Sequence, residues 1–550
     1  MKKPLLSELS LREKIGQLGV YRPNVCMDMM KENHQDVSLI GAVWSMGGLD
    51  MRVINMAFEA GEKQVTAKDQ WDFMAELISR TKIPALTAMD STRGLQGAIC
   101  DLPLLVDPPT VGAAASEELA YQRGRVNAMQ LKCAGAKWLW GPEEDLPNRQ
   151  SAVSLGRKFS DDPDLAIRMA KAEIKGIQDV GVASTAKHFP GDDEKEYRDP
   201  HVSAAMLRLT VEEWEKRQGR VFQEMIDCGV DSVMIGHQAF PACDHTKMNG
   251  YYLPSTVSYK VVTELLKEKM GFSGVVVTDA IEMHSLQSLF NEDSIKVAIA
   301  CINAGCDSIL GVHANFIDGI EKAVLDGEIA EERIDDACQR MLDMKEKLGL
   351  FERPTEEMNT EEVVAACKAL NREIAEKALS LVCDNNQMLP LSPDRYKKIT
   401  IIYSGYGKGI FESLEYMKDE FMRHGVEKVT AIQGLPTRTL AEERSAASDL
   451  MLYVSHIGCH QPRGCAGYTN DEFLTFYHVN IGGQKGKRIA VSLGSPYVWF
   501  DYYSDFDCYV NAYNTTEETQ RAFVRALYGE IPFAGGHPFR LIPEGFDVEY

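Results

Sequence analysis

Short apolar runs alternate with longer charged segments of helical spacing through the first 350 residues of the chain. Helical segments, such as those at 161–180, 210–228 and 258–269, separate the runs. Alternation of this kind favours parallel strands joined by helical crossovers, and eight units in roughly 330 residues predict a (β/α)8 barrel of the TIM type. The predicted strands are 18–21, 39–44, 85–89, 138–140, 181–186, 232–235, 275–278 and 307–310.

A second, shorter alternation follows a charged helical stretch at 353–368. Its strand-like runs are 398–403, 449–454, 488–493 and 507–512, with helices at 410–424 and 517–528. The fold class is therefore α/β. We predict a catalytic barrel at 1–350, a linker and entry helix at 351–375, and a smaller α/β sandwich at 376–550. An open doubly wound sheet is the main alternative to the barrel, but no G-x-G-x-x-G fingerprint follows the first strand.

Composition narrows the classes of partner. The 550 residues are 45% hydrophobic and 25% charged, which suits a globular protein with more than one core. A net charge of −22 argues against nucleic acid or an anionic membrane as partner. No apolar run reaches the roughly 18 residues that span a bilayer, and no secretory leader is visible. The 13 cysteines have no repeating spacing, so we expect free thiols and a cytoplasmic location.

Polar residues directly follow five of the predicted barrel strands. In a (β/α)8 barrel the catalytic groups lie at the C-terminal ends of the strands, so we expect these side chains to meet at one mouth. They are Asp90, Asp145, the Lys187-His188 pair, His237 and Asp279.

Several longer motifs share a family resemblance. Thr185-Ala-Lys-His-Phe-Pro-Gly191 is followed by Asp199-Pro200-His201, and a second segment runs through Glu268 to Asp279. With Gly156-Arg-Lys-Phe-Ser-Asp-Asp-Pro163 between the predicted strands, the chain resembles glycoside hydrolase family 3, in its bacterial β-N-acetylglucosaminidase branch. The likeness extends to Ala526-Leu-Tyr-Gly-Glu-Ile-Pro532 and so covers almost the whole chain. It implies a barrel followed by a sandwich, a small carbohydrate substrate, and no metal or cofactor.

The resemblance also implies the catalytic residues. Asp279 would be the nucleophile that forms a glycosyl ester. The alternative is an aspartate that caps the next helix. The branch places an Asp-x-His pair on a loop, where Asp199 and His201 fit. An imidazole can give and take a proton near neutral pH, and Asp199 would orient it. Asp192-Asp193 replaces a His-Gly pair in this loop, and we interpret the acidic residues 192–196 as a solvated charge run.

A second group of residues resembles the family's sugar-holding set. A carboxylate can grip a pair of sugar hydroxyls while cationic side chains donate to them, at about 1.5–3 kcal/mol for each charged hydrogen bond. Asp90 and Arg157 belong to this set, together with Lys187 and His188. His237 could line the same pocket or be structural.

Together these residues predict an exo-acting retaining β-N-acetylglucosaminidase (β-N-acetylhexosaminidase) that works as a monomer or homodimer. Three alternatives stay open. Phosphate could replace water as the acceptor, which would make the protein a phosphorylase. A glutamate of the C-terminal domain could be the acid/base, as in the family's β-glucosidases. The barrel could also be a decayed carbohydrate-binding module without activity.

Overall fold

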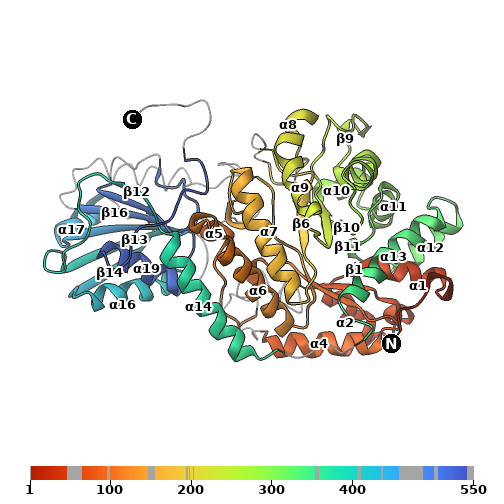
Figure 1. Ribbon diagram of the computed structural model, residues 1–550, viewed down its shortest axis with the longest axis horizontal. Helices are drawn as coiled ribbons and strands as arrows, with labels where there is room; N and C mark the ends of the chain where they lie inside the picture. The colour runs from red at the N-terminus through yellow and green to blue at the C-terminus, as the bar shows by residue number, and fades with distance from the viewer. Residues whose placement is uncertain are drawn as a thin grey trace. The chain divides into compact units, whose positions relative to one another are not determined.

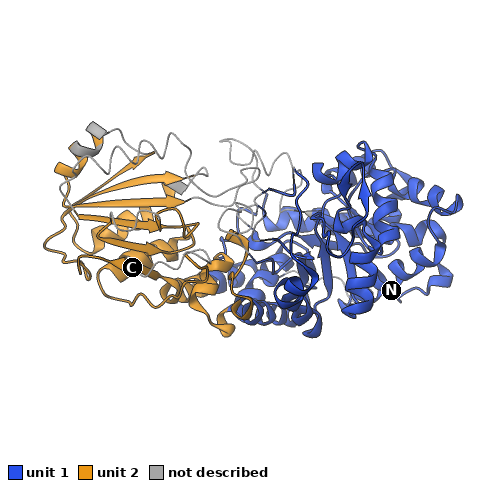
Figure 2. Cartoon of the chain, turned by 90° about the horizontal axis from the view of Figure 1, so that it is seen from above, with its two compact units in different colours: residues 1–105, 120–147, 166–367 blue, residues 106–119, 148–165, 368–550 orange. Residues whose placement is uncertain are grey.

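The chain divides into two units, which Figure 2 colours separately. The barrel unit comprises residues 1–105, 120–147 and 166–367, and the sandwich unit comprises 106–119, 148–165 and 368–550. The segments 106–119 and 148–165 lie between barrel strands in the sequence but belong to the sandwich unit. This computed structural model describes residues 2–45, 65–95, 99–146, 155–193, 196, 198–201, 203–352, 358–405, 410–434, 438–456, 487–500 and 506–541.

Each of the eight predicted barrel strands has a counterpart in the structure. The strand around Lys187 extends three residues beyond its predicted end, because Lys187 and Phe189 pair with the neighbouring strand. Lys187 and His188 consequently lie within this strand and not after it. The barrel strands are β1 (Gly19–Tyr21), β2 (Ala42–Ser45), β3 (Leu86–Met89), β5 (Trp138–Leu139), β6 (Thr185–Phe189), β7 (Ser232–Ile235), β10 (Val275–Thr278) and β11 (Ile309–Val312).

These strands are parallel and follow one another around a ring. One sheet has the order β11-β1-β2-β3-β5 and a second has the order β10-β7-β6. Parallel bridges join the two sheets at both edges, from Trp138 to Ala183 and from Val277 to Ser308. The predicted fold class, a TIM-type barrel with a second α/β domain, is confirmed. Figure 1 shows helices α6, α7, α11 and α13 beside the strands of this unit.

The helices of the barrel unit largely match the periodic segments of the sequence. The predicted helix at 210–228 is divided, because Arg217 leaves helical geometry with φ −119° and ψ −94°. The segment at 260–269 is π-helical. The helices are α1 (Leu11–Leu18), α2 (Pro23–Lys31), α4 (Ala67–Arg80), α6 (Glu117–Cys133), α7 (Pro163–Asp179), α8 (Val211–Lys216), α9 (Gln218–Asp227), α10 (His284–Gln287), α11 (Ser294–Ala304), α12 (Phe316–Leu325), α13 (Glu331–Lys347) and α14 (Thr360–Ala378).

Large aromatic side chains fill the barrel interior. Trp138 and Trp140 meet edge to face with ring centroids 5.7 Å apart, and both are buried in one apolar cluster. The indole Nε1–H of Trp138 donates to Thr185 Oγ1 and Ser232 Oγ, each at 2.9 Å. Satisfying this buried donor avoids a desolvation penalty. The packed interior fixes the strand ends that carry the polar side chains.

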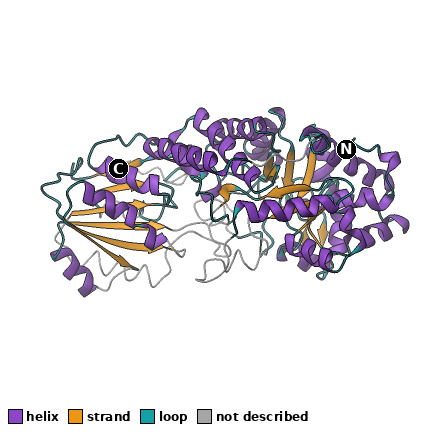
Figure 3. Ribbon diagram, turned by 90° about the horizontal axis from the view of Figure 1, so that it is seen from below, coloured by secondary structure: helices purple, strands orange, loops and turns teal. Residues whose placement is uncertain are grey.

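The sandwich unit contains a six-stranded sheet with helices against it, as Figure 3 shows. The strand order is β12-β17-β16-β15-β13-β14, with only β12 antiparallel to its neighbour. The strands are β12 (Ser380–Asp384), β13 (Lys398–Gly405), β14 (Lys428–Gln433), β15 (Leu450–His456), β16 (Lys487–Ser492) and β17 (Cys508–Asn511). The helices include α5 (Pro108–Ala114), α15 (Ile410–Ser413), α16 (Glu415–Arg423), α17 (Arg438–Ala446) and α19 (Glu517–Leu527).

The sequence predicted the four central strands of this sheet and missed both edge strands. β12 and β14 are mostly half-buried, whereas the four central strands are largely buried. Edge strands face solvent on one side, so their apolar pattern is weak. Among the residues that the structure describes, no helix is both long enough and apolar enough to cross a bilayer.

One buried lysine of the barrel unit has no carboxylate partner among the residues that the structure describes. Lys345 of α13 is fully buried, and its Nζ donates to Gln17 Oε1 at 2.5 Å. Burial lowers the pKa of Lys345 from its usual 10.5 to about 7. Between these two values the unfolded chain binds a proton that the native protein does not. The free energy of unfolding that depends on Lys345 therefore falls as the pH drops from about 10 to about 7.

We expect Lys345→Met, which keeps the chain length and removes the charge, to raise the free energy of unfolding by about 1–3 kcal/mol at pH 7. The gain should shrink towards pH 10, where the native lysine is neutral. Urea unfolding of both proteins at the two pH values measures the effect, with the exposed Lys175→Met as control. Equal pH dependence in parent and variant would contradict the assignment.

Candidate active site

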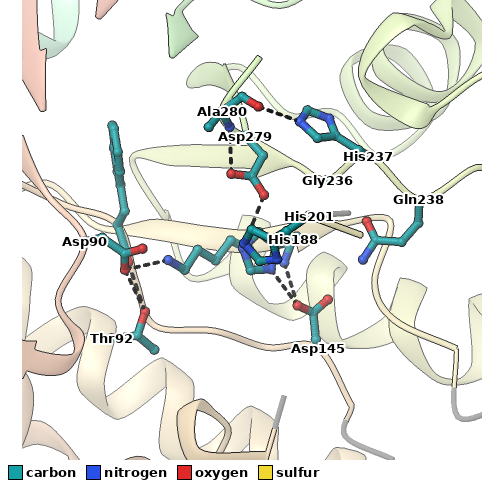
Figure 4. A network of polar contacts seen from close by, with 12 residues as sticks. Asp90, Thr92, Asp145, His188, His201, Gly236, His237, Gln238, Asp279 and Ala280 are labelled. Atoms are coloured by element: carbon teal, nitrogen blue, oxygen red, sulfur yellow. Dashed lines mark hydrogen bonds and ion pairs between the residues drawn. The ribbon is translucent and has the colours of Figure 1, made fainter. Parts of the chain in front are cut away.

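The C-terminal ends of the barrel strands bring most of the predicted site residues to one mouth. Asp90 follows β3, Lys187 and His188 lie in β6, and Asp279 follows β10. Figure 4 shows Asp90, His188 and Asp279 around a common space, with His237 beside the same strand ends. These polar side chains therefore lie together at the strand ends, as we expected from the sequence.

Asp279 is held with an ionised carboxylate. Its backbone N–H donates to Ile235 O at 2.9 Å, and its Oδ1 accepts from Ala280 N–H at 2.7 Å. Burial alone would raise the pKa of Asp279, but three neighbouring histidines and this N–H lower it well below its ordinary value. The alternative role as a helix cap is wrong, because α10 begins later, with Met283 in the capping position.

His188 lies between two carboxylates. Its Nδ1 is 2.8 Å from Asp145 Oδ2, and its Nε2 is 3.9 Å from Asp279 Oδ2. Burial lowers the pKa of His188, but the hydrogen bond and charge of Asp145 outweigh this and raise it. The structure therefore favours an imidazolium here. The sequence placed Asp145 at the mouth but did not reveal that it orients His188.

Asp90 and Lys187 form an ion pair on the other side of the mouth. Lys187 Nζ lies 2.9 Å from Asp90 Oδ1, and Lys187 is buried while Asp90 is partly exposed. Thr92 Oγ1 lies 3.3 Å from Asp90 Oδ1 and 3.2 Å from Trp140 O. A fixed carboxylate that still faces open space can accept from sugar hydroxyls. Thr92, which ties Asp90 to the neighbouring strand, was not found from the sequence.

His237 supports the backbone next to the nucleophile. Its Nε2–H donates to Ala280 O at 2.9 Å, and its Nδ1 lies 2.6 Å from Thr256 Oγ1. A carbonyl oxygen only accepts, so Nε2 carries the proton. Burial lowers the pKa of His237, which favours the neutral ring. Both ring nitrogens are engaged by protein groups, so a direct sugar contact would have to replace one of these bonds.

Asp199 and His201 form the close pair that the sequence motif predicted. His201 Nδ1 lies 2.6 Å from Asp199 Oδ1, and the His201 backbone N–H donates to the same oxygen at 2.9 Å. Asp199 is buried, whereas a quarter of the His201 side chain (25%) is exposed. The His201 carbonyl accepts from His284 N–H at 3.2 Å. The imidazole is also near enough to contribute to the lowered pKa of Asp279.

Two members of the acidic run, Asp193 and Glu196, differ from its interpretation as solvated, and Glu194 lies outside the described residues. Asp193 is 2% exposed and Glu196 is 8% exposed. Both carboxylates accept backbone N–H groups from the returning part of the loop, at Arg208 and Met206 respectively. The sequence alone does not show these partners, which lie 10 and 15 positions away.

Two further groups bear on binding. Arg157 lies at the end of a short helix, Leu155–Arg157, which belongs to the sandwich unit. Its sugar-binding role stays a prediction.

Glu143, Asp145 and His188 have potential metal-ligand atoms within 4.8 Å of one another. His188 Nδ1 already bonds to Asp145 Oδ2 at 2.8 Å, so we assign this cluster to orienting His188.

Comparison with known proteins identifies the family. The family model described as "Glycosyl hydrolase family 3 N terminal domain" matches residues 10–344. The chain belongs to glycoside hydrolase family 3. Its membership agrees with the barrel architecture and with an enzyme that cleaves glycosidic bonds.

Relatives within family 3 extend over different parts of the chain. The beta-N-acetylglucosaminidase/beta-glucosidase of Cellulomonas fimi is 26% identical over 561 residues, covering 97% of this chain and 94% of that protein. A beta-hexosaminidase of Hydrogenovibrio crunogenus is 32% identical over 193 residues, covering 35% of this chain and 51% of that protein. The sequence likeness therefore includes hexosaminidases, and one relative is named for two activities.

Two solved structures share the fold over nearly the full length of this chain. The beta-glucoside phosphorylase BglX matches with a TM-score of 0.83 at 25% identity, covering 98% of this chain and 95% of that chain. A family 3 beta-N-acetylglucosaminidase from Paenibacillus sp. str. FPU-7 matches with a TM-score of 0.80 at 23% identity, covering 97% and 99% respectively. The second likeness concerns the fold alone.

Proposed function

We propose that the protein is a retaining exo-β-N-acetylglucosaminidase that removes terminal β-linked N-acetylglucosamine from oligosaccharides. The observation that carries the proposal is the imidazole of His201, bonded to buried Asp199 and one of the three histidines that lower the pKa of Asp279. A nucleophilic carboxylate and a separate proton donor are the two groups that a retaining glycosidase requires. The hexosaminidase names among the relatives support the choice of sugar.

In the first step Asp279 attacks the anomeric carbon, and the glycosidic C–O bond breaks. The protonated His201 gives its Nε2 proton to the departing oxygen, so the leaving group departs neutral. The sugar stays bound as an ester of Asp279. Asp199 holds the ring by its Nδ1 throughout, which keeps Nε2 directed outward.

In the second step water attacks the same carbon from the face that the leaving group vacated. The now neutral His201 takes a proton from this water, and the ester bond to Asp279 breaks. Two inversions give net retention, and both side chains return to their starting protonation states. No group outside the chain and the water is needed to balance the reaction.

Sugar positioning falls to the fixed charges around the mouth. Asp90 would accept from two hydroxyls while Lys187 and His188 donate, since both are held by carboxylates at 2.9 and 2.8 Å. Arg157 completes the proposed set from the sequence motif. Hydrogen bonds to charged groups discriminate strongly against substrates that lack the partner hydroxyl.

Phosphorolysis is the second candidate function. The match to a beta-glucoside phosphorylase covers 98% of this chain at 25% identity. A neutral histidine also repels an incoming phosphate less than a carboxylate base would. A β-glucosidase that uses a glutamate of the sandwich unit, and a decayed binding barrel, receive less support, because the Asp199–His201 pair and the ionised Asp279 are both in place.

A small glycoside panel tests these functions. We expect hydrolysis of p-nitrophenyl β-N-acetylglucosaminide at least 10-fold faster than of the β-glucoside, with no dependence on phosphate. Initial rates with and without phosphate, and the sugar products, are the measurements. Phosphate-dependent rates with sugar 1-phosphate as product would favour the phosphorylase, and a preference for the glucoside would favour the glucosidase. The cytoplasmic location and the monomeric or dimeric state stay predictions from the sequence.

A further inference from the structure

We propose that Glu196 is a positioning residue that holds the Asp199–His201 pair in place for proton transfer. The proposal rests on the acid/base role of His201 given above. Glu196 lies three positions before Asp199, in the segment that leads from β6 to α8. Unlike the acidic side chains of most surface loops, it turns inward and is 8% exposed.

The Glu196 carboxylate joins the two sides of the loop. Its Oε1 accepts from Arg198 N–H at 3.0 Å and from Arg198 Nε at 2.8 Å. Its Oε2 accepts from Arg198 Nη2 at 2.5 Å and from Met206 N–H at 3.1 Å, and lies 3.3 Å from Arg208 Nη2. One carboxylate therefore connects Arg198, the residue before Asp199, to Met206 in the returning part of the loop.

Backbone hydrogen bonds join the returning part of the loop to the barrel. Leu207 N–H donates to Ala239 O at 2.8 Å, and Ala239 N–H donates to Ala205 O at 3.0 Å. Ala239 follows β7, only two positions after His237. Through Met206, Glu196 thus ties Arg198 to the part of the barrel that also supports the backbone beside Asp279.

Asp192 and Asp193 also accept hydrogen bonds, where the loop begins after β6. Asp193 Oδ2 accepts from Arg208 N–H at 2.6 Å, and Glu196 N–H donates to Asp193 O at 3.0 Å. Asp192 accepts from Gln238 Nε2 at 2.5 Å and, through its carbonyl, from Gln218 Nε2 at 2.7 Å. These contacts hold residues 192 and 193, whereas Glu196 contacts Arg198, the residue next to Asp199.

The charge of Glu196 matters as well as its shape. Burial raises the pKa of Glu196, but Arg198 and the backbone N–H groups lower it further, so the net shift is downward. The native carboxylate is ionised at neutral pH and pairs with the Arg198 guanidinium. Glu196→Gln keeps the size and one acceptor oxygen but loses this ion pair, whereas Glu196→Ala removes every contact.

Without this attachment the His201 ring keeps its bond to Asp199, because that bond lies within the turn itself. What changes is the position of the whole turn relative to Asp279. One direct link that persists is the bond from His284 N–H to the His201 carbonyl at 3.2 Å. A displaced imidazole transfers its proton poorly, while attack by Asp279 is unaffected. In kcat/KM, which reports the first step, the defect should therefore appear only where the leaving group needs a proton.

The test is the leaving-group dependence of kcat/KM on a series of aryl β-N-acetylglucosaminides. In Glu196→Ala we expect at least a 10-fold loss for a poor leaving group such as phenol and less than a 3-fold loss for 2,4-dinitrophenol. Glu196→Gln should lie between this variant and the parent. The matched control is Glu212→Gln, which breaks an exposed glutamate–lysine pair with Lys216 on α8 and should change neither value.

The outcomes separate this proposal from the function on which it rests. Equal losses for all leaving groups in Glu196→Ala, or no loss, overturn the positioning role while His201→Ala still shows the leaving-group dependence. If His201→Ala itself lacks that dependence, the acid/base assignment fails and the role of Glu196 fails with it. Faster hydrogen exchange of the Arg198 and His201 amides in Glu196→Ala would accompany the expected kinetic result.

Discussion

Asp279→Asn is expected to lower kcat/KM for p-nitrophenyl β-N-acetylglucosaminide by on the order of 10⁴-fold or more, as for other catalytic nucleophiles. The amide has nearly the same size and can still accept from Ala280 N–H, so the local backbone should persist. What is lost is the negative charge that the surrounding histidines stabilise and that attacks the anomeric carbon. Steady-state kinetics with highly purified variant measure the loss.

Covalent trapping provides the direct form of the same prediction. A 2-fluoro sugar with an activated leaving group should accumulate as an ester, and peptide mass spectrometry should place the adduct on Asp279. The matched control is Asp179→Asn, an exposed aspartate of α7 that pairs with Lys175. Full activity in Asp279→Asn, or an adduct on another residue, would remove Asp279 from the mechanism.

His201→Ala is expected to have the second largest effect, a loss of about 10²–10⁴-fold in kcat/KM for substrates with poor leaving groups. Loss for a 2,4-dinitrophenyl glycoside should be small, because that leaving group departs without a proton. The turnover of this activated substrate should then be limited by ester hydrolysis, since water lacks its base. Azide needs no base, so it should restore turnover and yield the glycosyl azide.

The neighbouring His284 supplies a control for this variant. Its side chain is exposed, and only its backbone N–H contacts the His201 carbonyl. His284→Ala therefore keeps that contact and should leave both substrates unaffected. If the poor-leaving-group substrate were cleaved by His201→Ala at the parent rate, another residue would have to be the proton donor.

The sequence predicted the barrel strands well because their signal is local. Each strand is a short apolar run with burial on both faces, and β7 and β10 match the predicted ranges in full. The two missed strands, β12 and β14, lie at the edges of the other sheet and are only half-buried. The break at Arg217 in the predicted helix also leaves no local signal in the sequence.

The residues of the candidate site could be predicted only from sequence motifs and from positions at the ends of strands. These gave Asp90, Lys187 and Asp279, but not which partner each side chain has. His237 illustrates the limit, since its two ring bonds to Thr256 and Ala280 depend on tertiary packing. The acidic run was misread for the same reason: a sequence of like charges predicts solvation unless its distant partners are known.

The raised pKa of His188, which favours its charged form, has a consequence for the second step of the proposed reaction. While Asp279 is ionised, the two opposite charges face each other at 3.9 Å. Forming the sugar ester cancels the carboxylate charge but leaves that of His188, so the surroundings of the anomeric carbon become more positive by one unit. Negatively charged acceptors are then attracted more strongly than before the first bond was broken. We therefore expect acceptor choice to depend on His188, a residue that takes no part in the proposed proton transfers.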